Sequence, residues 1–314
     1  MKRARRKTAQ RDEPGATVDS TAGSLQTGIL LMLASGVVFA LLDTGAKYLT
    51  DELPVLQVVW GRYFFSMALL PLIVGRVNPM RVARTKHLAL QIVRSLLLLA
   101  ATAFFFTALR FIPLADATAI SFVAPLLLTM LAIPLLGETV GRRRWSAVIV
   151  GLIGALIVIR PGFGMAGWAT LLPLASALAY TFYLIATRKL CAIDPPVTIF
   201  LYTGIVGTLV MTAVVPFFWT WPTLGGWLLM IALGVLGGGG HYLVIQAFRR
   251  APASALSPFT FAVIIWTTLT GYLVFGDVPD APTIAGAAVI VASGVYVFYR
   301  ERVVKLTPDG RDAT

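Results

Sequence analysis

Residues 108–145 read ALRFIPLADATAISFVAPLLLTMLAIPLLGETVGRRRW, and residues 247–277 repeat the same pattern as AFRRAPASALSPFTFAVIIWTTLTGYLVFGD. Both stretches place an arginine three residues before a proline, and both then continue through a long apolar run to a glycine and an acidic residue. Residues 107–160 align with residues 246–299 without a gap, at a constant offset of 139. The second half of the chain is therefore predicted to repeat the fold of the first half.

The chain is apolar along most of its length. Hydrophobic residues make up 58% of it and charged residues only 13%, with a mean hydropathy of +0.83. Soluble domains carry about 25% charged residues, and an apolar run of about 20 residues can cross the hydrocarbon core of a bilayer. This composition excludes an ordinary soluble domain. We expect ten transmembrane helices, at about residues 28–48, 54–75, 88–109, 113–136, 144–160, 166–187, 196–216, 226–248, 252–275 and 282–300.

Five of these spans fall in each half of the chain. An odd number inverts the second half relative to the first, and inverted repeats around a midplane site are typical of secondary transporters. The predicted fold class is an all-α membrane protein, with ten transmembrane helices in two inverted five-helix repeats. Its expected parts are a basic tail at 1–27, a first repeat at 28–160, a second repeat at 166–300 and a tail at 301–314.

Basic residues predict the orientation in the membrane. Of 26 Lys and Arg residues, 21 fall on the side of the two termini and 3 on the other side. The positive-inside rule places the first side, and hence both tails, in the cytoplasm. The apolar run after residue 27 is too long for a signal-peptide core, so we expect a retained first helix.

The two stretches quoted above, together with GLIGALIVIRPG at 151–162 and IAGAAVIVASGVYVF at 284–298, resemble the paired EamA-type repeats of the drug/metabolite transporter superfamily. The resemblance covers about residues 28–300. It implies a central substrate cavity, alternating access and a place in a bacterial inner (plasma) membrane. It does not imply a particular solute, because the superfamily carries amino acids, nucleotide sugars, vitamins and other metabolites, in either direction.

Several motif residues have structural explanations. Pro113 and Pro252 lack an N–H, so each predicts the first turn of a new helix. The Gly-acid pairs at 137–138 and 276–277 predict helix ends with a positive φ at the glycine, and hence scaffold roles. The four-glycine run at 237–240 would loosen the helix that contains it.

Small residues recur on the last helix of each half, at Gly151, Gly154, Gly286 and Gly294. Close backbone approach at small residues drives helix association in lipid. In the superfamily this helix packs at the periphery, so these glycines could serve packing within the chain or a homodimer contact.

Charges inside the spans are the leading site candidates, because an unpaired charge near the bilayer centre costs several kcal/mol. Asp43 and Arg62 lie at similar depth on consecutive helices, so they could form an ion pair, shared with Lys47. Both a static structural pair and a pair that binds solute or exchanges protons remain open. Their counterparts in the second half are Leu184 and Thr203. That asymmetry favours a role at the site.

Further candidates are less specific. Arg94 could be an anchor that reaches the headgroups or a cation in the cavity. His241 could be a ligand, a pH sensor or a packing histidine. Tyrosine and tryptophan rings inside spans need polar partners and could line a cavity. The predicted solute-binding residues are Asp43, Arg62, Tyr63, Arg94, Tyr180, Tyr183, Tyr202, His241, Tyr242 and Trp266.

The sequence predicts a secondary transporter for a small zwitterionic, anionic or aromatic metabolite, such as an amino acid, a vitamin or a related polar solute, with the solute and the lipid bilayer as partners. The sequence contains no P-loop motif and no Gly-x-Ser-x-Gly, and His87, His241 and Cys191 are too few for a metal centre. We therefore expect no enzymatic activity, no cofactor and no metal. The net charge of +12 is explained by the basic residues on the cytoplasmic side of the membrane, so we expect no nucleic-acid partner. The alternative is a lipid-carrier flippase or an accessory subunit. A polar, ring-lined central cavity would favour a solute, and a lateral opening lined only by apolar residues would favour lipid.

Overall fold

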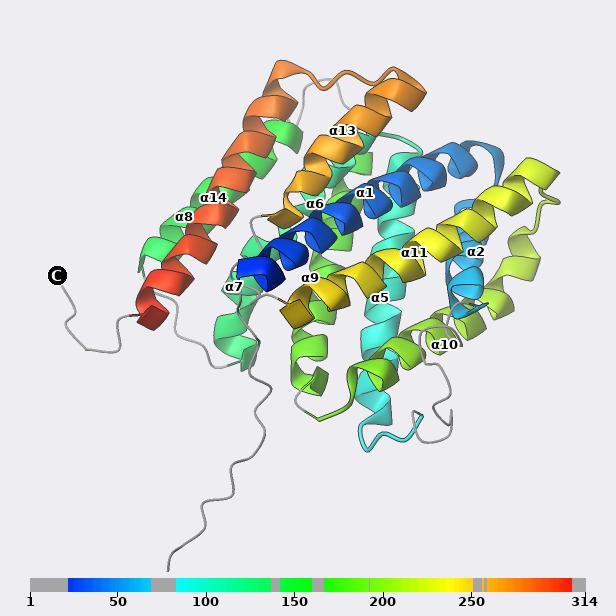
Figure 1. Ribbon diagram of the computed structural model, residues 1–314. Coiled ribbons are helices and arrows are strands. Elements are labelled where there is room, and N and C mark those ends of the chain that lie inside the picture. The colour runs from blue at the N-terminus through cyan, green and yellow to red at the C-terminus, as the bar shows by residue number, and fades with distance from the viewer. Residues whose placement is uncertain are drawn as a thin grey trace, which may run out of the picture.

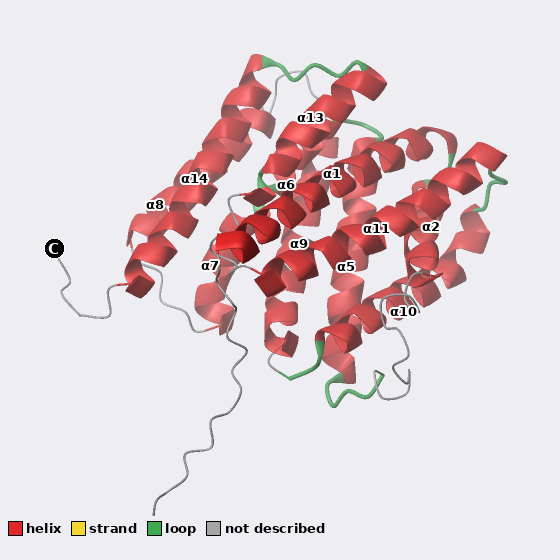
Figure 2. Ribbon diagram, in the orientation of Figure 1, coloured by secondary structure: helices red, strands yellow, loops and turns green. Residues whose placement is uncertain are grey.

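A computed structural model describes residues 22–68, 83–136, 142–159, 167–191, 193–250, 256 and 259–306. Over these ranges the chain forms helices joined by short connections and contains no strand (Figure 2). The first half comprises α1 (Ala22–Glu52), α2 (Val55–Ala68), α5 (Leu88–Leu109), α6 (Leu114–Ser121), α7 (Ala124–Leu136) and α8 (Arg142–Ile159). The second half comprises η1 (Gly167–Thr170), α9 (Leu171–Cys191), α10 (Pro196–Val214), η2 (Val215–Phe218), α11 (Leu224–Arg250), α13 (Ala262–Phe275) and α14 (Ala281–Leu306).

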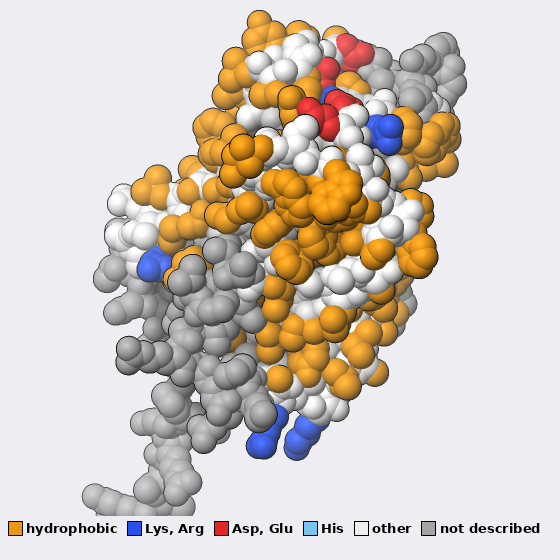
Figure 3. Space-filling view, turned by 90° about the vertical axis from the view of Figure 1, so that its right-hand side faces the viewer, with side chains coloured by type: hydrophobic (Ala, Val, Ile, Leu, Met, Phe, Trp, Pro, Cys, Tyr) orange, Lys and Arg blue, Asp and Glu red, His pale blue; other side chains and the backbone are white. Residues whose placement is uncertain are grey.

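The helices have the length and composition of membrane spans. Five are long and apolar enough to cross a bilayer by themselves: Gly23–Glu52, Leu88–Leu109, Gly167–Thr187, Val197–Phe218 and Leu224–Val244. Shorter apolar helices cover Leu114–Leu128, Val148–Ile159, Ala262–Phe275 and Ala281–Tyr296. Figure 3 shows a face covered mainly by hydrophobic side chains, with most of its visible charged side chains at the upper and lower ends and one basic side chain at the left edge. The chain is an all-α membrane protein, as predicted.

One predicted span is divided. Residues 113–136 were expected to form a single helix, but α6 ends at Ser121 and α7 begins at Ala124. Pro125 explains the break, because it lacks the N–H that would bond to the Ser121 carbonyl and its ring would clash with that carbonyl. Pro113 lies just before α6, at its N-cap. Pro252 lies outside the described residues.

The helix contacts repeat between the two halves (Figure 1). Helices α1, α2 and α5 of the first half correspond to α9, α10 and α11 of the second half. In the first half α1 and α2 both pack on α11, and in the second half α9 and α10 both pack on α5. The pairs α8·α14 and α2·α10 each join equivalent helices of the two halves. Phe122 and Phe261, which are 139 residues apart, meet with ring centroids 5.0 Å apart. Such exchange of equivalent contacts is the pattern expected of two repeats related by a pseudo-two-fold axis.

Glycines permit two of these close contacts. A Cβ on Gly154 would lie 2.9 Å from the carbonyl oxygen of Gly286, so the predicted small-residue contact joins α8 to α14 within the chain. The glycine run 237–240 lies inside α11, which continues through it to Arg250. A Cβ on Gly240 would lie 2.8 Å from the Phe39 ring, so this glycine lets α1 approach α11.

The turn after α13 has the predicted form. Gly276 adopts a positive φ of 73°, and its N–H donates to the Tyr272 carbonyl. The Asp277 N–H donates to the Gly271 carbonyl, which completes a helix C-cap. The equivalent Gly137 and Glu138 lie outside the described residues.

Candidate functional site

A cavity of about 280 Å³ lies at the centre of the helices, about midway along them. Both halves of the chain contribute to it, since α1, α2, α5, α6 and α7 supply part of the wall and α9, α11 and α13 supply the rest. Its lining residues are Phe39, Asp43, Arg62, Leu98, Ala101, Thr102, Phe105, Phe106, Thr118, Ser121, Phe122, Ala124, Pro125, Ser176, Tyr180, His241 and Val263. Four predicted site residues meet here: Asp43, Arg62, Tyr180 and His241.

Arg62 lies against the α5 side of the cavity. Its Nη1 donates to the Thr102 hydroxyl at 2.7 Å, and that hydroxyl lies 3.3 Å from the Tyr63 hydroxyl. The Arg62 guanidinium carbon is 5.6 Å from the ring centroids of both Tyr63 and Phe106. A guanidinium has five N–H donors, so most donors of Arg62 remain available to a molecule in the cavity.

Asp43 lines the same cavity from α1. Among the described residues its carboxylate accepts no hydrogen bond and forms no salt bridge, and the charge that acts on it is that of Arg62. The expected ion pair is therefore wrong: Lys47 bonds to Asp277 instead, with Nζ 2.6 Å from the carboxylate. Lys47 also lies 4.7 Å from the Phe275 ring centroid. An ionisable side chain without a hydrogen-bonded partner is rare inside a membrane protein, so Asp43 is a candidate site residue.

Aromatic rings complete the cavity wall. Tyr180 stacks on Tyr183, with centroids 5.4 Å apart and planes inclined by 24°. Phe39, which corresponds to Tyr180 at an offset of 141, meets His241 edge-on at 5.3 Å. The two halves thus place a ring at equivalent positions on opposite sides of the cavity.

Arg94 lies outside the lining of the central cavity and is only 3% exposed. Its Nε donates to Thr187, and its Nη2 donates to the Tyr183 hydroxyl, at 2.6 and 2.9 Å. Its Nη1 donates to the Ile199 carbonyl and to the Thr203 hydroxyl, at 3.1 and 2.7 Å. Its guanidinium carbon is 4.5 Å from the Tyr183 ring centroid. Arg94 therefore joins α5 to α9 and α10, and it is not a side chain that reaches for the headgroups.

The other predicted site residues are dispersed. Tyr63 lines a small adjoining cavity of about 40 Å³, to which Arg62 and His241 also contribute. The Tyr202 hydroxyl donates to the Ala83 carbonyl, away from the central cavity. Tyr242 is exposed, and the indole N–H of Trp266 has no partner among the described residues. Sequence position alone did not separate these rings from the ones that line the cavity.

Small hydroxyl side chains in the cavity wall were not predicted. They are Thr102, Thr118, Ser121 and Ser176. Thr118 and Ser121 lie on α6, just before the break at Pro125, and a proline inside a predicted span could have directed attention to them. Among the described residues no cluster of His, Cys, Asp or Glu could hold a metal ion.

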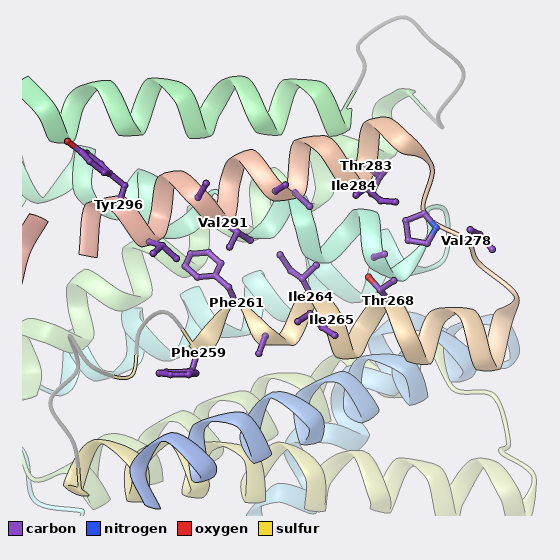
Figure 4. Close-up of a pocket in the computed structure, with 17 residues that line it drawn as sticks. Phe259, Phe261, Ile264, Ile265, Thr268, Val278, Thr283, Ile284, Val291 and Tyr296 are labelled. Carbon is purple, nitrogen blue, oxygen red and sulfur yellow. The ribbon is translucent and has the colours of Figure 1, made fainter. Parts of the chain in front are cut away.

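A second space, larger and almost wholly apolar, lies between α13 and α14 (Figure 4). Its volume is about 1150 Å³. Phe122 of the central cavity and Phe261 of this groove are in ring contact, so the two spaces are neighbours that share a wall. The molecule therefore has a ring-lined central cavity with charged side chains, which favours a solute as cargo. It also has an apolar groove between α13 and α14, which favours a lipid.

Comparison with known proteins connects this architecture to transport. The EamA-like transporter family matches the chain twice, over residues 26–160 and 167–299. An S-adenosylmethionine uptake transporter of Rickettsia prowazekii (strain Madrid E) is 27% identical over 278 residues, which cover 88% of this chain and 93% of the relative. A riboflavin transporter of Vibrio cholerae is 29% identical over 274 residues, covering 86% and 92%.

A pseudopaline exporter of Pseudomonas aeruginosa is 27% identical over 276 residues, covering 86% of this chain and 95% of the relative. A solved crystal structure has a TM-score of 0.62 at 19% identity, covering 90% of this chain and 99% of that one. The solved structure shares the fold, and the three named relatives are all named for the transport of a small molecule. Their named solutes differ, and so do their named directions of transport.

Proposed function

Because the chain belongs to the EamA-like transporter family, we propose that it moves a small zwitterionic metabolite with a planar ring, by alternating access at the central cavity. It is a small-molecule transporter by its relatives and a multi-pass protein of a bacterial inner membrane. The observation that carries the choice of solute is the unpaired Asp43 carboxylate beside Arg62, whose donors are mostly unused. No relative fixes this choice, since one is named for S-adenosylmethionine and another for riboflavin.

Asp43 and Arg62 bind different groups of the solute. A cationic group, such as an ammonium, pairs with the Asp43 carboxylate, and an acidic or carbonyl oxygen accepts hydrogen bonds from Arg62. Charge-assisted hydrogen bonds of this kind are about twice as strong as neutral ones. The Thr102 hydroxyl fixes one side of the guanidinium, so Arg62 offers its remaining donors in a defined direction.

The rings of the cavity bind the apolar part of the solute. Tyr180 presents a face supported by Tyr183, and Phe39 and Phe105 add further aromatic surface. Pockets for small ligands combine such apolar walls with a few placed polar groups. S-adenosylmethionine carries ammonium, carboxylate and sulfonium groups together with a purine ring, so the solute of one relative combines charges of both signs with a planar ring.

Alternating access requires contacts that can close each side of the cavity. Toward the ends of α1 and α13, Lys47 bonds to Asp277 and the Thr44 hydroxyl bonds to Thr270 at 2.8 Å, and both bonds join the two halves. In our proposal these bonds break when that side opens. Because α1 and α2 pack on α11 while α9 and α10 pack on α5, each moving body combines helices of both halves, and in our proposal both tails lie in the cytoplasm.

The experiment is transport into and out of vesicles that contain the purified protein, with a panel of metabolites and with or without a proton gradient. Asp43→Asn and Arg62→Gln are compared with Asp51→Asn, a neutralised carboxylate at the exposed end of α1. We expect the two cavity variants to lose transport while they keep the wild-type melting temperature. Full activity of Asp43→Asn on every transported solute would refute the site.

One observation favours a lipid-carrier flippase, namely the apolar groove between α13 and α14. A flippase would need polar groups for the headgroup along the path of the lipid, whereas the groove offers almost none and the charges lie in the central cavity. Failure of the whole metabolite panel, together with movement of a labelled lipid carrier between leaflets, would support this alternative. Failure of both assays would support the accessory subunit.

A further inference from the structure

The small cavity beside the central one is an extension of the same site. Its volume is about 40 Å³ against about 280 Å³ for the central cavity, so it can take one group of a solute but not a whole solute. Arg62 and His241 line both cavities. Tyr63, Ser66 and Thr203 add hydroxyls to the small one, and none of the described residues in its lining is acidic. The charge that faces the small cavity is therefore the positive charge of Arg62.

One edge of the Arg62 guanidinium is unused. Nη1 donates to Thr102, whereas neither Nε nor Nη2 donates to any residue that the structure describes. Nε and Nη2 carry parallel N–H bonds on the same edge of the planar guanidinium. Such an edge matches two oxygens of one planar group, so it can bind a carboxylate through two hydrogen bonds. A single carbonyl oxygen would leave half of this edge unused.

Gly237 keeps this edge accessible. It lies on α11 and lines the small cavity, and a Cβ at this position would lie 3.5 Å from the Arg62 Nε. The same Cβ would lie 3.4 Å from the Ser66 hydroxyl oxygen. The Nε edge therefore lies where the two cavities meet, and any side chain larger than glycine would place carbon beside it.

We propose that the solute carries a carboxylate, which binds the Nε–Nη2 edge of Arg62 in the small cavity, and that Gly237 is the positioning residue that keeps this edge open. The inference rests on the proposed function and adds which anionic group the solute presents and where that group lies. Asp43 lines the central cavity but not the small one, so the ammonium and the carboxylate occupy different parts of the site.

The hydroxyls of the small cavity favour a carboxylate over a phosphate. A phosphate would bring further oxygens that need donors of their own. The Ser66 hydroxyl already donates to the Gly234 carbonyl, and the Thr203 hydroxyl already donates to the Ile199 carbonyl. A hydroxyl has one proton to donate, so neither can serve the additional oxygens.

The test compares ligands that differ in the carboxylate. S-adenosylmethionine is paired with its decarboxylated form, which keeps the ammonium, the sulfonium and the purine, and L-tryptophan is paired with tryptamine. Binding of each probe to the purified full chain is measured by titration calorimetry in detergent. We expect the wild type to bind the carboxylate member of a pair about tenfold to a hundredfold more tightly than the other member.

Gly237→Ala tests the positioning role, and Gly239→Ala is its matched control. Both put the same methyl group into the same glycine run of α11 and raise its helix propensity equally, but a Cβ at Gly239 would meet no atom within 4 Å. We expect Gly237→Ala to weaken binding of the carboxylate member until the two members bind almost equally. Gly239→Ala should keep the wild-type preference. General damage to the fold would weaken both members alike, so the ratio of the two affinities isolates the positioning effect.

Arg62→Lys guards against misfolding of Gly237→Ala. It keeps the positive charge but removes the two parallel donors, so the preference for the carboxylate member should fall here too. An unchanged preference in either folded variant would overturn the proposal, as would equal binding of both members of a pair to the wild type. Binding of neither pair to the wild type would instead refute the proposed class of solute, and this inference with it.

Discussion

Arg62 and Arg94 are both arginines within predicted spans, but their surroundings differ. Arg62 bonds to one hydroxyl and leaves the rest of its guanidinium facing the central cavity. Arg94 donates four hydrogen bonds, to side chains and a carbonyl of α9 and α10, and lies outside the lining of the central cavity. An arginine with satisfied donors holds the scaffold together, whereas one with spare donors is available to a solute. We therefore propose a structural role for Arg94 and a recognition role for Arg62, on the number of donors that each already uses.

The repeat makes this comparison more direct. The position equivalent to Arg62 in the second half is Thr203, and Thr203 is one of the hydroxyls that accept a hydrogen bond from Arg94. The first half thus places the cation Arg62 on its second span. At the equivalent position the second half places Thr203, which accepts a hydrogen bond from Arg94 on the third span of the first half. In our proposal, the same place in the fold serves solute recognition in the first half and helix packing in the second half.

The largest effect is expected at Arg94. Arg94→Met removes four hydrogen bonds and the contact with the Tyr183 ring, so it should lower the free energy of unfolding by about 3 kcal/mol. Arg62→Met removes one hydrogen bond and should cost about 1 kcal/mol or less. Thermal unfolding of both variants in the same detergent measures the difference. Equal melting temperatures would show that the number of donors does not distinguish the two arginines.

The next effect concerns transport. Asp43→Asn and Arg62→Gln each remove a charge-assisted contact of about 1.5–3 kcal/mol with the solute, which raises KM by about tenfold to a hundredfold. Since the two side chains share no hydrogen bond, their losses should add, so the double variant should transport less than either single variant and be no more stable. Recovery of transport in the double variant would indicate a static structural pair.

A smaller effect is expected for the Lys47–Asp277 pair, whose side chains are 12% and 27% exposed. Lys47→Met and Asp277→Asn should each lower stability by about 1 kcal/mol or less, and a double-mutant cycle should return a coupling of similar size. Because the bond joins the two halves, its loss should also increase the labelling of a cysteine placed at Phe39 in the cavity. Unchanged labelling would contradict a role in closing this side.

Much of the fold followed from the sequence because it is written in local patterns. Apolar length and the offset of 139 predicted the spans and the repeat, and Gly276 predicted the end of α13. The partners of the charges were not predictable in this way. Lys47 meets a carboxylate 230 residues away, and Arg94 meets Thr203 at a separation of 109. Periodicity places a charge inside a span, but it carries no information on which distant helix lies opposite.

The smallest predicted effect tests whether Arg94 also acts on the cavity through the tyrosines. Tyr183 accepts a hydrogen bond from Arg94 and supports the Tyr180 ring, which lines the cavity. Tyr183→Phe keeps the ring that stacks under Tyr180 but removes the acceptor, so stability should fall by about 0.5–1.5 kcal/mol while transport stays near the wild-type rate. Tyr183→Ala also removes the support, so transport should fall as well. If Tyr183→Phe lowered transport as much as Tyr183→Ala at equal stability, the hydroxyl bonded to Arg94 would belong to the recognition machinery, and the separation between the two arginines would fail.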